Sequence, residues 1–196
     1  MSDFITLEEY KQSEGIASPK EDLRLELLIP SVSQLVKTYC GNSIIDYYTT
    51  NKIETLNVNW DTHIIQLTES PINTIIKVEE RNSYNAAYAE LTEAAYAFYL
   101  DAGTDSLLRT TGGINYTSWA KGPGSVRVTY TAGYATCPAD LKLAVIDMIT
   151  YYIKDEHKER RTMQGASIQN AGSTTQANNV AFPDHIKRVL DLYKNF

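Results

Sequence analysis

The apolar residues of this chain follow two different periods, and this change of period constrains the fold more than any other feature. Before about residue 44 and after about residue 131, apolar side chains recur every three or four residues, as on one face of a helix. Between these limits they alternate with polar residues in short runs, as in strands. The pattern predicts an α+β fold: a mainly α-helical core of about four helices, at residues 1–43 and 132–161, with a small antiparallel β subdomain inserted at 44–131.

The first helix has a complete start signal. Thr6 and Glu9 have the spacing of a capping box, and Ile5 and Tyr10 occupy the two positions of a hydrophobic staple. Gly15 stands where a helix of this length ends. We therefore expect a short helix between Thr6 and Gly15.

A second helix start follows at Ser18, with Pro19 at the first helical position. This helix is expected to reach about Tyr39, with a kink or a break at Pro30. Its apolar stripe is predicted to contain Leu23, Leu27, Leu28, Val32, Leu35, Val36 and Tyr39.

The central region contains four short apolar segments typical of strands, at 56–60, 64–67, 72–78 and 96–100. The clearest strand is 126–131, where Val126, Val128 and Tyr130 face one way and Arg127, Thr129 and Thr131 the other. Residues 84–95 are rich in alanine and fit either a helix or a long hairpin loop.

A third helix is expected from Pro138 to about Lys154, followed by a charged helix end. Residues 162–182 then contain no charge and eleven Ser, Thr, Asn or Gln residues, which predicts a mobile loop. Residues 183–196 form a short amphipathic helix that would be marginally stable alone. We expect this helix to dock on a partner.

Composition limits the partners. The net charge is −6 and the pI about 5.1, so a broad surface that binds DNA phosphates is not expected. No apolar segment approaches the length needed to span a bilayer, and the N-terminus lacks a signal sequence, so we expect no membrane association and a soluble protein made and kept in the cytosol. The chain has 14 Tyr but only 4 Phe, which favours surfaces that are partly wet and partly buried, such as subunit contacts.

The sequence indicates no catalytic, cofactor or metal site. His63, His157 and His185 are not spaced with a second metal ligand, and Cys40 and Cys137 have no local base that would make either a nucleophile. Two cysteines are too few for a disulfide framework, so both are expected to be buried thiols. Neighbouring carboxylates such as Glu79 and Glu80 point to different sides of a strand, which favours solvated charge over acid–base chemistry. We therefore expect a chain that is not an enzyme.

The strand-to-helix segment 126–145 resembles the head-to-tail connector (adaptor, or head completion) proteins of tailed bacteriophages. Its most specific pieces are Val126 to Tyr134 and Cys137 to Val145. In order, residues 5–15, 22–41 and 182–193 resemble the family's first helix, second helix and closing helix. The departures are Pro30 and the large β insertion, which many smaller members lack.

The resemblance implies a structural virion protein that forms a ring, with twelve copies beneath the portal protein at the head–tail interface. The ring would extend the channel toward a stopper or tail completion protein, and double-stranded DNA would pass through it without specific binding during genome ejection. Carried over by position, the portal would be bound by Pro183, Ile186, Lys187, Arg188, Val189, Leu190 and Tyr193. The loop would contact a neighbouring subunit through Met163, Ile168, Val180 and Phe182.

Tyrosines within the matched motifs and helices are the candidates for contacts between subunits, although some must be core: Tyr10, Tyr130, Tyr134, Tyr151, Tyr152 and Tyr193. Three alternatives stay open. The first is a tail-side neck or tail completion protein, which the β insertion favours. A DNA-binding regulator is less favoured, because no basic recognition helix is present. An enzyme is the third, since a site built from distant residues would escape sequence reasoning.

Overall fold

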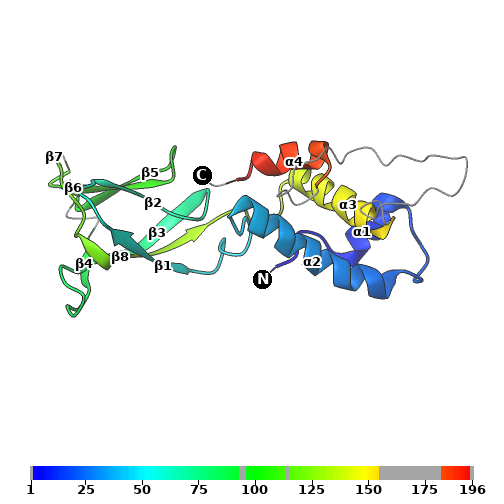
Figure 1. The fold of residues 1–196 in the computed structure, drawn as a ribbon, viewed down its shortest axis with the longest axis horizontal. Coiled ribbons are helices and arrows are strands. Elements are labelled where there is room, and N and C mark those ends of the chain that lie inside the picture. The colour runs from blue at the N-terminus through cyan, green and yellow to red at the C-terminus, as the bar shows by residue number, and fades with distance from the viewer. Residues whose placement is uncertain (1, 93–95, 114, 155–181, 195–196) are drawn as a thin grey trace, which may run out of the picture. The chain divides into compact units, whose positions relative to one another are not determined.

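The computed structural model describes residues 2–92, 96–113, 115–154 and 182–194. These residues form four helices and eight strands and divide into two compact units (Figure 1). The helical unit comprises the described residues up to Gly41 and from Thr136 to Lys194, and the β unit comprises those from Asn42 to Ala135.

The prediction of a mainly α-helical fold is wrong, because the described residues form eight strands, in two antiparallel sheets, and four helices. The sequence pattern missed strands for a physical reason. Two of them contain only two or three residues, too few for an alternation to be visible. A third, Ser106–Thr111, has its two leucines side by side and so does not alternate.

Helix α1 (Leu7–Glu14) begins as predicted. The Thr6 side chain accepts a hydrogen bond from the Glu9 N–H, and the Glu9 carboxylate accepts one from the Thr6 N–H at 2.8 Å. Gly15 ends the helix in the left-handed conformation, with φ of 66°. The capping box is therefore confirmed.

Helix α2 (Asp22–Cys40) begins later than predicted and runs without a break through Pro30. Ser18 does not cap it, because the Ser18 hydroxyl accepts a hydrogen bond from the Lys20 N–H in a turn before the helix. The buried face of α2 also differs from the predicted stripe. It carries Leu25, Ile29, Val32, Val36 and Cys40.

Two leucines of the predicted stripe, Leu23 and Leu27, are 85% and 69% exposed. The positions Leu23 and Leu27, like Leu25 and Ile29, are four residues apart, so both pairs have helical spacing. Because apolar residues surround most of this helix, the sequence did not distinguish its inner face from its outer face.

Helix α3 (Ala139–Ile153) packs against α2, and α4 (Asp184–Asp191) packs against both (Figure 1). Helix α3 contributes most of the buried apolar side chains of the helical unit: Leu141, Ala144, Val145, Ile146, Met148 and Ile149. The predicted helix from Pro138 to about Lys154 is confirmed.

The β unit contains two antiparallel sheets. The first has the order β1-β8-β3-β4, formed by Lys52–Val58, Gly122–Ala132, Ile72–Glu80 and Ala89–Leu91. The second has the order β2-β6-β5, formed by Ile64–Gln66, Ser106–Thr111 and Phe98–Asp101, with β7 (Asn115–Tyr116) paired to β6. Because β4 pairs with β3, the ambiguous segment after residue 84 contains a β-hairpin rather than a helix in its described part.

The inner faces of the two sheets share one hydrophobic core. The alternation predicted for 126–131 is confirmed, since Val126, Val128 and Tyr130 are fully buried in this core. Phe98 and Leu107 bring the second sheet into it, and Trp119 is also buried there. The next residues along these strands therefore point outward from the sandwich.

Candidate interaction surfaces

The apolar face of α4 packs on the helical unit itself. Ile186 and Leu190 are almost completely buried, and Phe182, just before the helix, is buried with its ring edge-on to Tyr39 at a centroid distance of 5.1 Å. A short amphipathic helix gains most of its stability from such packing. In this structure the partner that α4 needs is supplied by α2 and α3.

Polar contacts anchor the end of α4. The Tyr39 hydroxyl donates a hydrogen bond to the Asp191 carboxylate at 2.7 Å, and the Tyr193 hydroxyl donates one to Asp140 at 2.6 Å. The bond from Tyr193 lowers the pKa of Asp140 below its ordinary value. Burial, and then the hydrogen bond to Asp191, raises the pKa of Tyr39 to about 12. These bonds tie the end of α4 to α2 and to the start of α3.

The structure therefore divides the residues predicted to bind the portal. Ile186 and Leu190 face the chain's own core, and Arg188 is exposed. The others are partly exposed: Pro183, Lys187, Val189 and Tyr193. Leu192, which the sequence argument did not select, is 76% exposed just after α4.

The residues predicted to contact a neighbouring subunit are mostly outside the described residues. Met163, Ile168 and Val180 belong to this group. Phe182 is described and lies against Tyr39 of the same chain. The prediction for this loop stays a prediction.

Burial outweighs the effect of a nearby lysine on the pKa of each cysteine, Lys194 for Cys40 and Lys142 for Cys137. Burial raises the pKa of Cys40 and of Cys137 to about 12, so both thiols stay protonated near neutral pH. Within the described ranges, no three His, Cys, Asp or Glu side chains cluster as metal ligands would. The helices in the same ranges are all too short or too polar to cross a bilayer.

The strand-to-helix segment that carries the family resemblance has a specific local geometry. Gly133 has φ of 91°, and a Cβ atom there would lie only 2.2 Å from the Ile44 carbonyl oxygen. The same oxygen accepts a hydrogen bond from the Tyr134 N–H at 2.8 Å. Glycine is therefore needed where the chain leaves β8 and passes the segment that follows α2.

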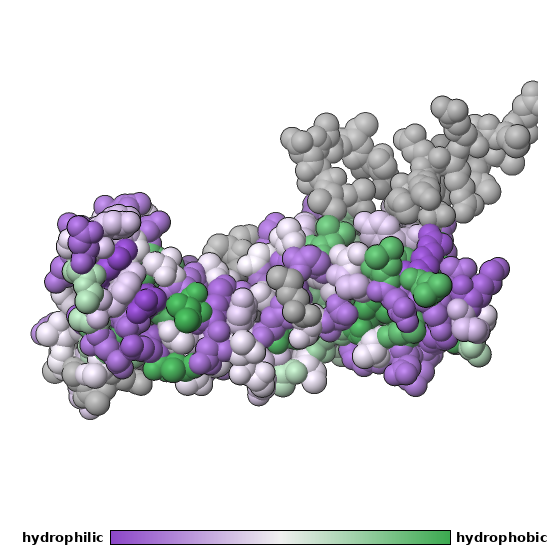
Figure 2. All heavy atoms as spheres, turned by 90° about the horizontal axis from the view of Figure 1, so that it is seen from below, coloured by the Kyte–Doolittle hydropathy of each residue, from purple (hydrophilic) through white to green (hydrophobic). Residues whose placement is uncertain are grey.

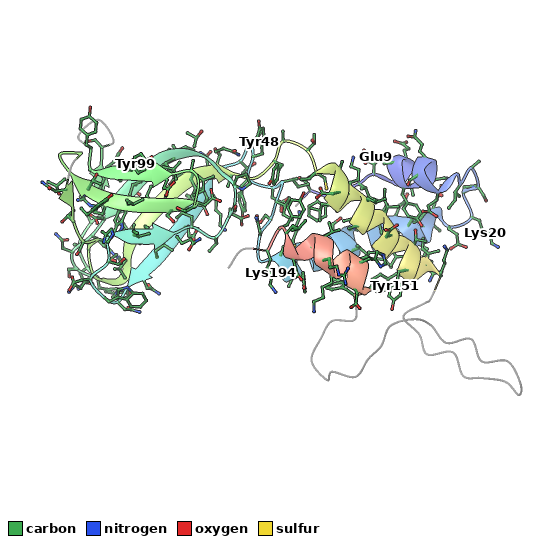
Figure 3. The ribbon with its side chains drawn as sticks, turned by 90° about the horizontal axis from the view of Figure 1, so that it is seen from above. Glu9, Lys20, Tyr48, Tyr99, Tyr151 and Lys194 are labelled. Carbon is green, nitrogen blue, oxygen red and sulfur yellow. The ribbon has the colours of Figure 1, made fainter. Side chains whose placement is uncertain are left out.

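A surface that the sequence did not reveal lies on the outer side of the sheet β2-β6-β5. Tyr96, Tyr99 and Tyr116 are 65%, 60% and 66% exposed there (Tyr99 is labelled in Figure 3). Tyr99 and Ile64 both pair with Leu108 across the sheet, so these three side chains form one row. We call this surface the aromatic face: Ile64, Tyr96, Tyr99, Leu108 and Tyr116.

The tyrosines that the sequence motifs suggested differ in exposure. Tyr10 and Tyr130 are core residues with at most 1% exposure, whereas Tyr134 is 39% exposed and Tyr151, Tyr152 and Tyr193 are partly exposed. Sequence alternation indicated that Tyr99 points away from Phe98. Only the structure shows that Tyr99 pairs with Leu108 and that Phe98 is the one that points into the core.

Among the described residues, these features define a class of protein: a chain with a helical unit, a β sandwich and exposed surfaces suited to protein contacts. The profile of the head completion protein family matches residues 3–196. The head completion protein of Escherichia phage T5 is 22% identical over 192 residues, covering 97% of this chain and 98% of that protein.

Solved structures with a similar fold come from gene transfer agent (GTA) particles. A chain in the neck of an empty GTA particle, computed with C6 symmetry, has a TM-score of 0.61 at 13% identity and covers 98% of this chain and 90% of that chain. A chain in the neck of a native particle, computed with C12 symmetry, has a TM-score of 0.54 at 13% identity, covering 100% and 94%.

The chain belongs to the head completion protein family. The predicted resemblance to phage head-to-tail connector proteins is confirmed, and with it a structural role in connecting head and tail.

Proposed function

We propose that this chain forms a ring beneath the portal in the virion neck and continues the DNA channel toward a stopper or tail completion protein. The observation that carries the proposal is the family match, which spans residues 3–196. The similar neck chains come from particles treated with C6 and C12 symmetry, which supports a ring of twelve copies. No catalytic step is part of this function. The subunit would be made in the host cytoplasm and act in the virion.

The outward side of α4 is the proposed portal contact. Arg188 and Leu192 are exposed there, and Lys187 and Val189 are partly exposed. The buried Ile186 and Leu190 would act indirectly, by fixing the helix on α2 and α3. On this proposal α4 binds the portal with its exposed side and not with its apolar face. Substitutions can therefore test the exposed residues separately from the buried Ile186 and Leu190.

Passage of DNA agrees with the charge of the chain. Each DNA phosphate that a protein neutralises adds to its affinity for DNA. A chain with a net charge of −6 is not suited to neutralise phosphates over a broad surface. We propose that double-stranded DNA passes through the ring without specific binding. We also keep the prediction that residues 162–182 contact the neighbouring copy.

A charge-reversed α4 tests the portal contact. Arg188→Glu should lose binding to the purified portal protein of the same phage, while Lys20→Glu, an equally large charge change in the exposed turn before α2, should keep it. Binding is measured by the mass of the complex with portal rings. The free energy of unfolding should stay within about 0.5 kcal/mol for both variants, because both sites are on the surface.

Two results would contradict the proposal. Portal binding that is unchanged in Arg188→Glu would remove α4 from the contact. If the unchanged chain bound purified tails and not the portal, the chain would be a tail-side neck or tail completion protein instead.

A further inference from the structure

We propose that the β unit supplies the contact between neighbouring copies in the ring: the aromatic face of one copy packs on the outer face of β1, β8 and β3 of the next copy. This inference rests on the proposed ring, and it adds the surfaces that build it. We call the second surface the β8 face: Ile53, Thr55, Lys77, Arg127 and Thr129.

The aromatic face has the composition of a protein contact. Three exposed tyrosines lie together with Ile64 and Leu108, and tyrosine is enriched in interface cores because its ring is apolar and its hydroxyl is polar. The inner side of the same sheet is already filled by Ile65, Phe98 and Leu107. The outward row is therefore not needed for the core of this unit.

A hollow in the aromatic face indicates what kind of group it accepts. Its volume is about 160 Å³, and its lining includes Tyr96, Tyr99 and Tyr116. Small-molecule sites usually have volumes of about 300–1,000 Å³. A hollow below that range fits one protruding side chain, aliphatic or cationic, better than it fits a free ligand.

The β8 face offers such side chains. Ile53 on β1 is 66% exposed and lies opposite Thr129 on β8. Lys77 on β3 lies opposite Thr129 from the other side, so an aliphatic and a cationic side chain flank Thr129. Arg127 and Lys77 both bind the Glu79 carboxylate, at 2.7 and 2.8 Å, and the Arg127 guanidinium also lies 4.1 Å from the centre of the Tyr88 ring. Ile53 is therefore the side chain that protrudes from this face, with the cations beside it. Figure 2 shows one side of the β unit as a mostly hydrophilic surface with isolated hydrophobic residues.

The geometry of a ring favours a second copy as the occupant. A ring of more than two copies needs two different and complementary surfaces on each chain, because each contact joins unlike surfaces. The two outer faces of a sandwich point away from each other, so each can hold a different neighbour. Tyrosine rings on one face and an aliphatic side chain with cations on the other complement each other chemically.

Paired cysteines test this contact in the full chain. The variant with Ile53→Cys and Tyr99→Cys should form a ladder of disulfide-linked oligomers under mild oxidation, read on a denaturing gel. A bond within one copy is excluded, because disulfides need Cα atoms within about 7 Å and the two sites lie on opposite faces of the sandwich. Each single variant should give dimers at most.

The matched control is the pair Leu23→Cys and Tyr99→Cys. Leu23 is 85% exposed and lies in α2 of the helical unit, on neither face of the sandwich, so this pair should form no ladder. If the first pair forms no ladder while both its thiols react with a small maleimide, the inference is overturned. Protection of the thiol introduced by Tyr99→Cys from maleimide, without a ladder, would assign the aromatic face to another partner, and would also overturn it.

Ring formation is measured separately, by the mass of the complex with the portal protein. If the Ile53→Cys and Tyr99→Cys variant builds normal rings on the portal but forms no ladder, the contact is wrong and the proposed function stands. If the unchanged chain builds no ring, the proposed function fails.

Discussion

Two surfaces of this chain, the apolar face of α4 and the aromatic face of the β unit, differ in whether the chain itself covers them. The apolar face of α4 looks in the sequence like a docking surface, yet it is buried on α2 and α3 of the same chain. The aromatic face of β2-β6-β5 left no clear pattern in the sequence, yet its tyrosines are exposed. For α4, amphipathic periodicity thus indicated which side of the helix is buried, and not which molecule buries it.

Truncating the buried side of α4 has the largest expected effect on stability. Leu190 in α4 is completely buried and Leu192, just after the helix, is 76% exposed, so the two leucines form a matched pair. Leu190→Ala should lower the free energy of unfolding by about 2–5 kcal/mol, because it leaves a cavity. Leu192→Ala should change it by less than about 0.5 kcal/mol. Urea denaturation measures both. Equal effects would mean that α4 does not pack as described.

The polar anchor of α4 should contribute less. Tyr39→Phe removes the hydroxyl that binds Asp191, which should cost about 1 kcal/mol. The pKa of Tyr39 rises from 10.0 to about 12 on folding, so the folded state favours the neutral phenol. This stability is fully present below pH 10 and is lost as the pH rises from 10 to about 12.

Urea denaturation across this alkaline range tests the anchor. Tyr39→Phe should lose less stability between pH 10 and 12 than the unchanged chain. Parallel curves for Tyr39→Phe and the unchanged chain would remove Tyr39 as an anchor.

A smaller effect is expected at acid pH on the β8 face. Hydrogen bonds from Arg127 first, and from Lys77 second, lower the pKa of Glu79 from 4.5 to about 2. The ionised form is therefore favoured by folding, and its contribution to stability, present above pH 4.5, is lost as the pH falls to about 2. Glu79→Gln should remove this loss and cost about 1 kcal/mol or less at pH 7, because the cations that bind Glu79 are partly solvated. If the free energy of unfolding fell equally steeply between pH 4.5 and 2 in Glu79→Gln and in the unchanged chain, Glu79 would not be the source of this pH dependence.

The smallest effect on stability is expected on the aromatic face. Tyr99→Ser should change the free energy of unfolding by less than about 0.5 kcal/mol, because its ring is outside the core. The same substitution should weaken association between copies, measured by sedimentation. A large loss of stability would place Tyr99 in the core of its own chain and remove it from the contact.

Local signals predicted much of the fold. The capping box of α1, the alternation in β8 and the start of α3 each depend on a few neighbouring residues, and all three are confirmed. The inner face of α2, the short strands and the balance between helix and strand depend on contacts between distant residues. These features were predicted incorrectly, because a sequence that is apolar on several sides of a helix does not select one of them.

The surfaces were harder to predict than the fold. The high tyrosine count indicated contacts, but the motif tyrosines Tyr10 and Tyr130 are core, and Tyr99 became a candidate only through its pairing with Leu108. For α4, the sequence correctly placed Ile186 and Leu190 on one apolar side. It could not show that α2 and α3 cover that side.

The most direct test of the central claim is the mass of a mixture of two variants. Tyr99→Asp blocks the aromatic face and Ile53→Asp blocks the β8 face, so each variant keeps one working surface. At a concentration where the unchanged chain forms rings in solution, each variant alone should stay a single subunit. The equimolar mixture should form dimers and nothing larger, because one pair of surfaces remains. Rings from either variant alone, or a mixture that behaves as two separate subunits, would contradict the account.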